Sequence, residues 1–349
     1  MILYVSIFMS LALLALANVS NRQKTLLFCA LYVFFVIFVG ARLDTGCDFS
    51  TYYLRFKYLF FNNIDSLFDT TEPGFFLISY LTKKAGLEYV WLNVFAAGIF
   101  FYYLLKFARN HPRPLLLIAL VFPILVIQLS MSGVRQALAV AFLMGALDAF
   151  LHAKRMQVVL YILIGSTFHQ SLIILLPLAL MVGRSYSFAR VVGAIVILMP
   201  VAAYLLSGRA EVYQDRYIEE IYGDMDSAGA IFRLGLLVIT AAIFELYTSR
   251  MARMFPNEYN LMRLFALVSF ALIPVMLINT VALHRLIFYV VPMQAYILAA
   301  LPSALFASRR SVQIAEIATI AVYAAYILVW FSASRHANIC YVPYQNYLF

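Results

Sequence analysis

The polar residues that could carry chemistry in this chain lie within or beside long apolar runs. They are Arg42, Asp44, Asp48, Tyr52, Arg135, His169, His284 and Arg285. Charged or titratable side chains in or beside membrane spans are costly, so they usually mark function. A guanidinium fork pairs with phosphate oxygens, and a His or Asp beside it can deprotonate a sugar hydroxyl. The set therefore suits transfer of a sugar that is activated by a diphosphate.

The segment from Arg42 to Tyr52 contains two acids that could act as bases. Asp44, Asp48 and Tyr52 are spaced at i, i+4 and i+8, so they share one face if the segment is helical. Gly46 instead favours a turn, with a helix that begins near Asp48. Asp48 is then either a helix cap or a catalytic residue, and Asp44 is a second candidate for the base.

Arg135 follows Gly133 at the expected start of a helix, in the sequence Ser130-Met-Ser-Gly-Val-Arg-Gln. Free N–H groups at a helix start, together with a guanidinium, form an anion site. The alternative is an arginine that lies along the lipid and extends its charge to the interface. We expect Arg135, with Arg42 and Arg285, to bind a diphosphate.

A polar break interrupts the apolar run 157–182 at its middle. Its residues are Gly165, Ser166, Thr167, His169, Gln170 and Ser171. Such a break is tolerated within a membrane only where it is buried in protein or lines a cavity. We therefore expect two short helices that meet at His169, near the outer face. His169 is the first choice of base because its ordinary pKa lies nearest neutrality, and the alternative is a histidine satisfied within the core.

Acidic and tyrosine side chains suit sugar hydroxyls generally. The expected sugar contacts are Tyr52, Glu72, Gln136, Arg216, Tyr217 and His284. Segment 208–229 alternates acids, bases and tyrosines, which suits either a sugar-binding lid or an ordinary solvated helix with interfacial tyrosines. The pair formed by His284 and Arg285 belongs either to the site or to an interface anchor.

The composition places these residues in a membrane protein. Of 349 residues, 65% are hydrophobic and 12% are charged, about half the charged fraction of a soluble domain. The apolar runs are continuous rather than alternating, which excludes outer-membrane barrel strands and leaves helices. The predicted fold class is an all-α polytopic membrane protein, a single domain over 1–349 with about 12 transmembrane or re-entrant helices. The expected spans are 2–19, 25–41, 90–108, 115–131, 135–151, 157–182, 191–207, 230–248, 261–279, 286–307 and 311–332.

Plain Lys and Arg residues in short loops predict the orientation, because basic loops mark the cytoplasmic side. They are Arg22/Lys24, Arg109/Arg113, Lys154/Arg155, Arg184/Arg190, Arg250/Arg253 and Arg309/Arg310. All of them fall on that side if the run 157–182 goes into the membrane and comes back. The N-terminus and the long loops 42–89 and 208–229 then lie outside, where the two loops are expected to form a lid over the site.

Other features exclude further classes of partner. The net charge of +9 is dispersed over many loops, so it does not indicate a nucleic-acid partner. No P-loop or Cys/His spacing of a metal site occurs, so neither a cofactor nor a metal is expected. Cys47 and Cys340 fall in predicted outer segments and could pair in an oxidising compartment, although spacing does not show proximity. Residues 2–19 resemble a signal peptide, but no Lys or Arg precedes them, so we expect a retained span.

Four motifs of the first half of the chain together resemble the EpsG family of Wzy-type polysaccharide polymerases. They are the Arg42–Tyr52 segment, Glu72-Pro-Gly-Phe-Phe, Ser130-x-x-x-x-Arg135-Gln-x-Leu-Ala and Phe168-His169-Gln-Ser-Leu. The resemblance implies a bacterial inner membrane protein that joins oligosaccharide repeat units carried on undecaprenyl diphosphate at the periplasmic face. It also implies the multi-span architecture of C-type glycosyltransferases and a chain-length regulator protein as a partner.

The expected mechanism is an inverting glycosyl transfer without a metal. The arginines neutralise the leaving diphosphate, while His169, Asp44 or Asp48 deprotonates the acceptor hydroxyl. Asp44 and Asp48 are four residues apart, so an Asp-x-Asp metal motif is not evident. Two alternatives stay open, a ligase that transfers a finished glycan once and a transporter or flippase for the lipid-linked sugar. A membrane acyltransferase is disfavoured because His169 has no acid at short spacing.

Overall fold

The computed structural model describes residues 1–17, 19–59, 64–67, 70–183, 193 and 228–348, and the apolar runs within them form helices. Seven of the described helices are long and apolar enough to cross a membrane. They are α2 with its π-helical end η1 (Asn21–Phe35 and Val36–Gly40), α5 (Tyr89–Arg109), α7 (Val134–Leu151), α11 (Ala228–Leu246), α13 (Tyr259–Ile278), α14 (Thr280–Leu305) and α15 (Arg309–Ala333). The all-α polytopic class is therefore confirmed.

Shorter helices complete the described part of the chain. The α-helices are α1 (Ile2–Leu16), α3 (Phe49–Leu54), α4 (Pro73–Lys84), α6 (Pro114–Val121), α8 (Arg155–Phe168), α9 (Leu178–Met181), α12 (Thr248–Met254) and α16 (Arg335–Tyr341). The π- and 3-10 turns are η2 (Arg55–Leu59), η3 (Ile64–Leu67), η4 (Phe122–Ser130) and η5 (Gln170–Leu175). Almost all of the predicted span 191–207 and loop 208–229, with Arg216 and Tyr217, lies outside the described residues.

Two of the long helices form the centre of the bundle. The buried share of the most apolar stretch is 89% in α7 and 83% in α14, but only 28% to 50% in the other five. Helices α7 and α14 are therefore surrounded by protein, and they carry Arg135, Gln136, His284 and Arg285. Helix α14 begins at Thr280, earlier than the expected 286, so His284 and Arg285 lie inside it rather than beside a loop.

The run 157–182 folds back on itself, as the sequence predicted. Helix α8 ends at Phe168, His169 is extended, and the 3-10 turn η5 follows at once. Arg155 at the start of α8 donates a hydrogen bond to the carbonyl of Val182 (3.2 Å), so the chain has returned to the end at which α8 began.

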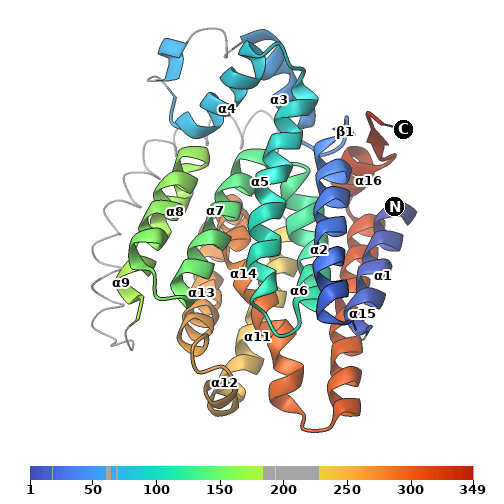
Figure 1. The fold of residues 1–349 in the computed structure, drawn as a ribbon, viewed down its shortest axis with the longest axis vertical. Helices are drawn as coiled ribbons and strands as arrows, with labels where there is room; N and C mark the ends of the chain where they lie inside the picture. Colours follow the sequence, from blue (N-terminus) through green and yellow to red (C-terminus); the bar gives the residue numbers. More distant parts are fainter. Residues whose placement is uncertain (18, 60–63, 68–69, 184–192, 194–227, 349) are drawn as a thin grey trace.

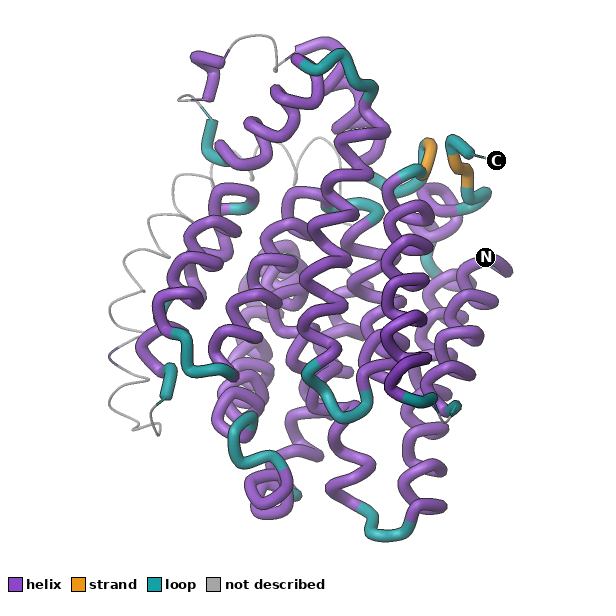
Figure 2. Tube along the Cα trace, in the orientation of Figure 1, coloured by secondary structure: helices purple, strands orange, loops and turns teal. Residues whose placement is uncertain are grey.

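The loop after α2 and the C-terminus are joined at one end of the bundle (Figures 1 and 2). Cys47 and Cys340 form a disulfide, so the pairing that the sequence left open is present. Strands β1 (Arg42–Leu43) and β2 (Gln345–Asn346) pair antiparallel beside it. Helices α3 and α4 lie at the same end, whereas α12 and the α5–α6 and α14–α15 connections lie at the opposite end (Figure 1).

Gly46 permits this join because of its backbone angle and its lack of a side chain. Its φ is +103°, and a Cβ atom there would lie 1.9 Å from the carbonyl oxygen of Met131. The same loop also hydrogen-bonds to the turn before α7, since Ser132 Oγ accepts from the Asp48 N–H (3.3 Å). The close approach therefore places the Arg42–Tyr52 motif against the motif that begins at Ser130.

We expect Gly46→Ala to destabilise the protein by about 3 kcal/mol or more, because a strained φ and a backbone clash add together. Thermal unfolding in detergent measures the effect. Gly86→Ala is the matched control, since Gly86 also has a positive φ (+72°) but has no atom within 4 Å of the added Cβ. It should cost only about 1–2 kcal/mol. Equal losses for both variants would show that the approach to Met131 does not constrain the loop.

Candidate active site

The turn before α4 brings an acid to the break between α8 and η5. Glu72 occupies the N-cap position of α4, and Pro73 fills the first helical position, where no N–H donor is needed. Gly74 lets α4 approach α8, because a Cβ atom there would lie 2.2 Å from Thr167 Oγ1. The sequence Glu-Pro-Gly therefore places the Glu72 carboxylate beside His169.

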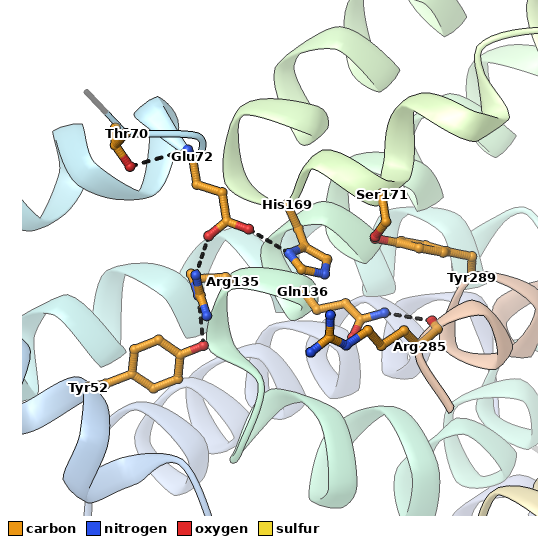
Figure 3. A network of polar contacts seen from close by, with 9 residues as sticks. All are labelled: Tyr52, Thr70, Glu72, Arg135, Gln136, His169, Ser171, Arg285 and Tyr289. Carbon is orange, nitrogen blue, oxygen red and sulfur yellow. Dashed lines mark hydrogen bonds and ion pairs between the residues drawn. The ribbon is translucent and has the colours of Figure 1, made fainter. Parts of the chain in front are cut away.

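One carboxylate joins three helices at this point (Figure 3). Glu72 Oε1 lies 2.7 Å from His169 Nδ1, and its other oxygen accepts from Nη1 of Arg135. Arg135 Nε donates in turn to the Tyr52 hydroxyl (3.0 Å), and its guanidinium carbon lies 5.5 Å from the centre of the Tyr52 ring. The structure thus brings together four residues that the sequence singled out in four separate motifs.

The charges in this cluster balance. The Glu72 side chain is 5% exposed and that of His169 is 11% exposed, so their interaction is screened little by water. Burial alone would raise the pKa of the Glu72 carboxyl, but the hydrogen bond from His169 and the charge of Arg135 hold it below its ordinary value. Glu72 is therefore an anion, and the Arg135 cation neutralises it.

The ionised carboxylate fixes the tautomer of His169. A carboxylate only accepts hydrogen bonds, so the Nδ1 atom of His169 must carry the proton that points to Glu72. The Nε2 atom of the neutral ring then has a free lone pair. An acid that accepts a hydrogen bond from Nδ1 in this way orients the ring so that Nε2 can act as a general base.

A second group of polar contacts adjoins the first (Figure 3). Gln136 Nε2 donates to the backbone carbonyl of Arg285 (2.7 Å), which ties α7 to α14. The hydroxyls of Ser171 and Tyr289 are 2.7 Å apart, which ties η5 to α14. No motif in the sequence indicates Tyr289, and the only signal for it is a tyrosine one helical turn after Arg285.

A comparison with protein-family models matches residues 25–346 to the EpsG family. The chain belongs to the EpsG family. EpsG is a family of Wzy-type polysaccharide polymerases. Neither the curated proteins nor the solved structures contain a match to this chain.

Among the described contacts, His169 pairs with Glu72 and not with the two acids of the first family motif. Asp44 and Asp48 are exposed, and neither appears among the described contacts of the imidazole. Asp44 has a positive φ (+43°) and precedes α3, so Asp44, Asp48 and Tyr52 do not share one continuous helix. Asp48 occupies the N-cap position of α3, but its side chain makes no capping hydrogen bond.

Arg42, expected to bind a diphosphate, is buried instead beneath the loop that it begins. It is 1% exposed and donates to the backbone carbonyls of Thr45 (3.0 Å), Met131 (3.1 Å) and Val39. These contacts hold the loop to the turn before α7. In this EpsG-family chain, therefore, the predicted site residues that group with His169 in Figure 3 are Glu72, Arg135, Tyr52, Gln136 and Arg285.

The lowered pKa of Glu72 predicts that the stability of the protein depends on pH. The folded form favours the carboxylate, so Glu72 contributes stability above the ordinary pKa of 4.5, and this contribution disappears as the pH falls through the lower folded value. We expect Glu72→Gln to lower the unfolding temperature at pH 7 and to approach the wild type below pH 4.5.

Parallel melting curves in detergent at neutral and acidic pH measure this difference. Glu88→Gln is the control because Glu88 is exposed and its side chain makes no capping bond at the start of α5. A Glu72→Gln deficit that stays constant at all pH values would contradict an ionised, stabilising carboxylate.

Proposed function

We propose that this protein is an inverting polymerase that joins oligosaccharide repeat units carried on undecaprenyl diphosphate. The observation that carries the proposal is the Glu72–His169 pair in a chain of the EpsG family. A carboxylate and an arginine hold His169 as a neutral base. A base in this form suits deprotonation of a sugar hydroxyl near neutral pH.

The reaction has one bond-forming and one bond-breaking event at the anomeric carbon of the donor. The acceptor hydroxyl loses its proton to Nε2 of His169 as its oxygen attacks that carbon. The bond from the carbon to the diphosphate breaks on the opposite face, and its electron pair leaves with the phosphate oxygen. Attack opposite to the leaving group inverts the configuration, and the proton passes from the imidazole to water after release.

Cationic side chains would stabilise the diphosphate as its negative charge grows. Arg285 is the main candidate, because Gln136 holds its backbone and its charge acts at the His169 ring. Arg135 already neutralises Glu72, so we assign it chiefly to orienting the base and Arg42 to holding the loop. Charge that appears only in the transition state should affect turnover more than binding, and neutralisation by arginine requires no metal ion.

The site would face the periplasm, in a bacterial inner membrane. The Cys47–Cys340 disulfide lies at the end of the bundle that carries α3 and α4, and disulfides persist in oxidising compartments. The connections that carry Arg109/Arg113 and Arg309/Arg310 lie at the other end, as basic cytoplasmic loops would. The same orientation suits a C-type glycosyltransferase architecture, with α7 and α14 at its centre.

Substitution of His169 tests the base. We expect His169→Ala to reduce polymerisation of purified lipid-linked repeat units at least about 100-fold, because general base catalysis typically contributes this much. Asp44→Asn and Asp48→Asn are the matched controls and should retain activity within a few fold. Full activity of His169→Ala at normal protein levels would remove His169 as the base, and loss in either Asp variant alone would transfer the role to that acid.

The product distinguishes polymerase from ligase and transporter. A polymerase should extend lipid-linked repeat units into a ladder of increasing length without an ion gradient. A single transfer would instead show a ligase, and movement of the lipid across vesicles without a new glycosidic bond would show a flippase.

A further inference from the structure

Arg233 is a buried cation that neither the family motifs nor the proposed reaction uses. It lies in the first two turns of α11 and is 4% exposed. Its Nη1 atom donates to Gln128 Oε1 (2.8 Å), its Nη2 atom contacts His284 Nδ1, and its guanidinium carbon lies 5.2 Å from the centre of the Phe288 ring. The salt bridges of the described residues include none to Arg233. A buried charge held in this way is expensive and usually has a function.

The contact with Arg233 determines the tautomer of His284. A guanidinium has five donors and no acceptor, so the Nδ1 atom of His284 must accept the hydrogen bond. Nδ1 then carries no proton, and a neutral ring places its single proton on Nε2. Protonation of Nδ1 would set two donors against each other. The ring of His284 is therefore a neutral donor at Nε2.

The two imidazoles thus have opposite tautomers, for opposite reasons. Glu72 accepts from Nδ1 of His169 and leaves a lone pair on Nε2, whereas Arg233 donates to Nδ1 of His284 and leaves a proton on Nε2. His284 directly precedes Arg285 on α14, and the same helix contacts the His169 site through the Gln136–Arg285 and Ser171–Tyr289 hydrogen bonds (2.7 Å each). His284 is only partly buried and retains accessible surface, as a ligand contact requires.

The neighbours of Arg233 hold it in place from three further elements. Gln128 belongs to the π-helical stretch η4, and its Oε1 atom also accepts from the Tyr326 hydroxyl of α15 (3.0 Å). His284 and Phe288 are one turn apart on α14, with ring centres 5.1 Å apart and nearly perpendicular. The network therefore links η4, α11, α14 and α15 around the hydrogen bond between Arg233 and His284.

We propose that His284 donates a hydrogen bond from Nε2–H to the departing diphosphate, and that Arg233 is the positioning residue that keeps this proton on Nε2. The assignment rests on the proposed glycosyl transfer. His169 accepts the hydroxyl proton, the carbon–oxygen bond to the diphosphate breaks, and the phosphate oxygen that gains the electron pair receives the hydrogen bond. His284 transfers no proton, because a neutral imidazole donor stabilises an oxyanion without releasing its hydrogen.

Nitrogen-15 NMR of the histidine-labelled full-length protein tests the tautomer directly. The sequence has five histidines, and His284→Gln identifies the signals of His284. We expect one unprotonated Nδ1 and one protonated Nε2 in the wild type and in Arg233→Lys, which keeps a donor. Arg233→Met should give a mixture of tautomers. A wild-type His284 with a proton on Nδ1 would overturn the proposal.

Kinetics with a lipid diphosphate-linked donor test the role in turnover. His284→Ala should lower kcat on the order of 100-fold with little change in KM, the effect expected for loss of one oxyanion donor. Arg233→Met should lower kcat only a few fold, by the share of molecules whose His284 carries the proton on Nδ1. Arg233→Lys should retain most of kcat because lysine keeps a donor to Nδ1 of His284. A purely structural role would not make kcat depend on that donor. Arg310→Met is the control, because Arg310 is exposed at the start of α15, at the opposite end of the bundle.

The outcomes separate this inference from the proposed function. Normal kcat in a folded Arg233→Met variant, with polymer made by the wild type, would overturn the role of Arg233 and leave the polymerase intact. A wild type that makes no polymer would overturn the polymerase, and the NMR experiment would still decide the tautomer.

Discussion

The arrangement of the site depends on a single carboxylate. Glu72 has two oxygens, and they bind two different helices, α7 through Arg135 and the start of η5 through His169. An unpaired ionised acid at 4% exposure would be very costly, so the arginine makes the burial possible. Because Arg135 neutralises the charge of Glu72, the carboxylate can orient the His169 ring without leaving an unbalanced charge beside it.

The frame around this carboxylate is a set of close backbone approaches. Gly46 meets the Met131 carbonyl, Gly74 meets Thr167, and the disulfide from Cys47 ties the first loop to the end of the chain. Each close approach fixes the position of one element relative to its neighbour. Side chains on α3, α4 and α7 can then meet within hydrogen-bond distance, although their motifs are widely separated in sequence.

The residue that contacts Nδ1 of each histidine determines the tautomer of its ring. An acceptor there makes a ring that takes protons, and a donor there makes a ring that gives hydrogen bonds. His284 belongs to α14, and the turn η5 that follows His169 contacts the same helix through Ser171 and Tyr289. The glycosyl transfer that we propose needs both properties at once, one at the attacking hydroxyl and one at the leaving group, and neutral imidazoles would supply them without placing another charge in a buried site.

The sequence by itself determined the membrane class, the break at His169 and the residue types of the site, because apolar run length and the cost of buried polar groups are local properties. It also indicated the return of 157–182, through the positions of the basic residues. It did not determine which acid serves His169, since Glu72 is 97 residues away and Asp44 and Asp48 are farther still, so sequence distance favours none of them clearly. Arg42 and Arg135 likewise look alike as isolated arginines, yet one faces backbone carbonyls and the other a carboxylate. Only the tertiary structure decided these pairings, because hydrogen-bond partners depend on distances of about 3 Å that helix packing sets and that sequence spacing does not encode.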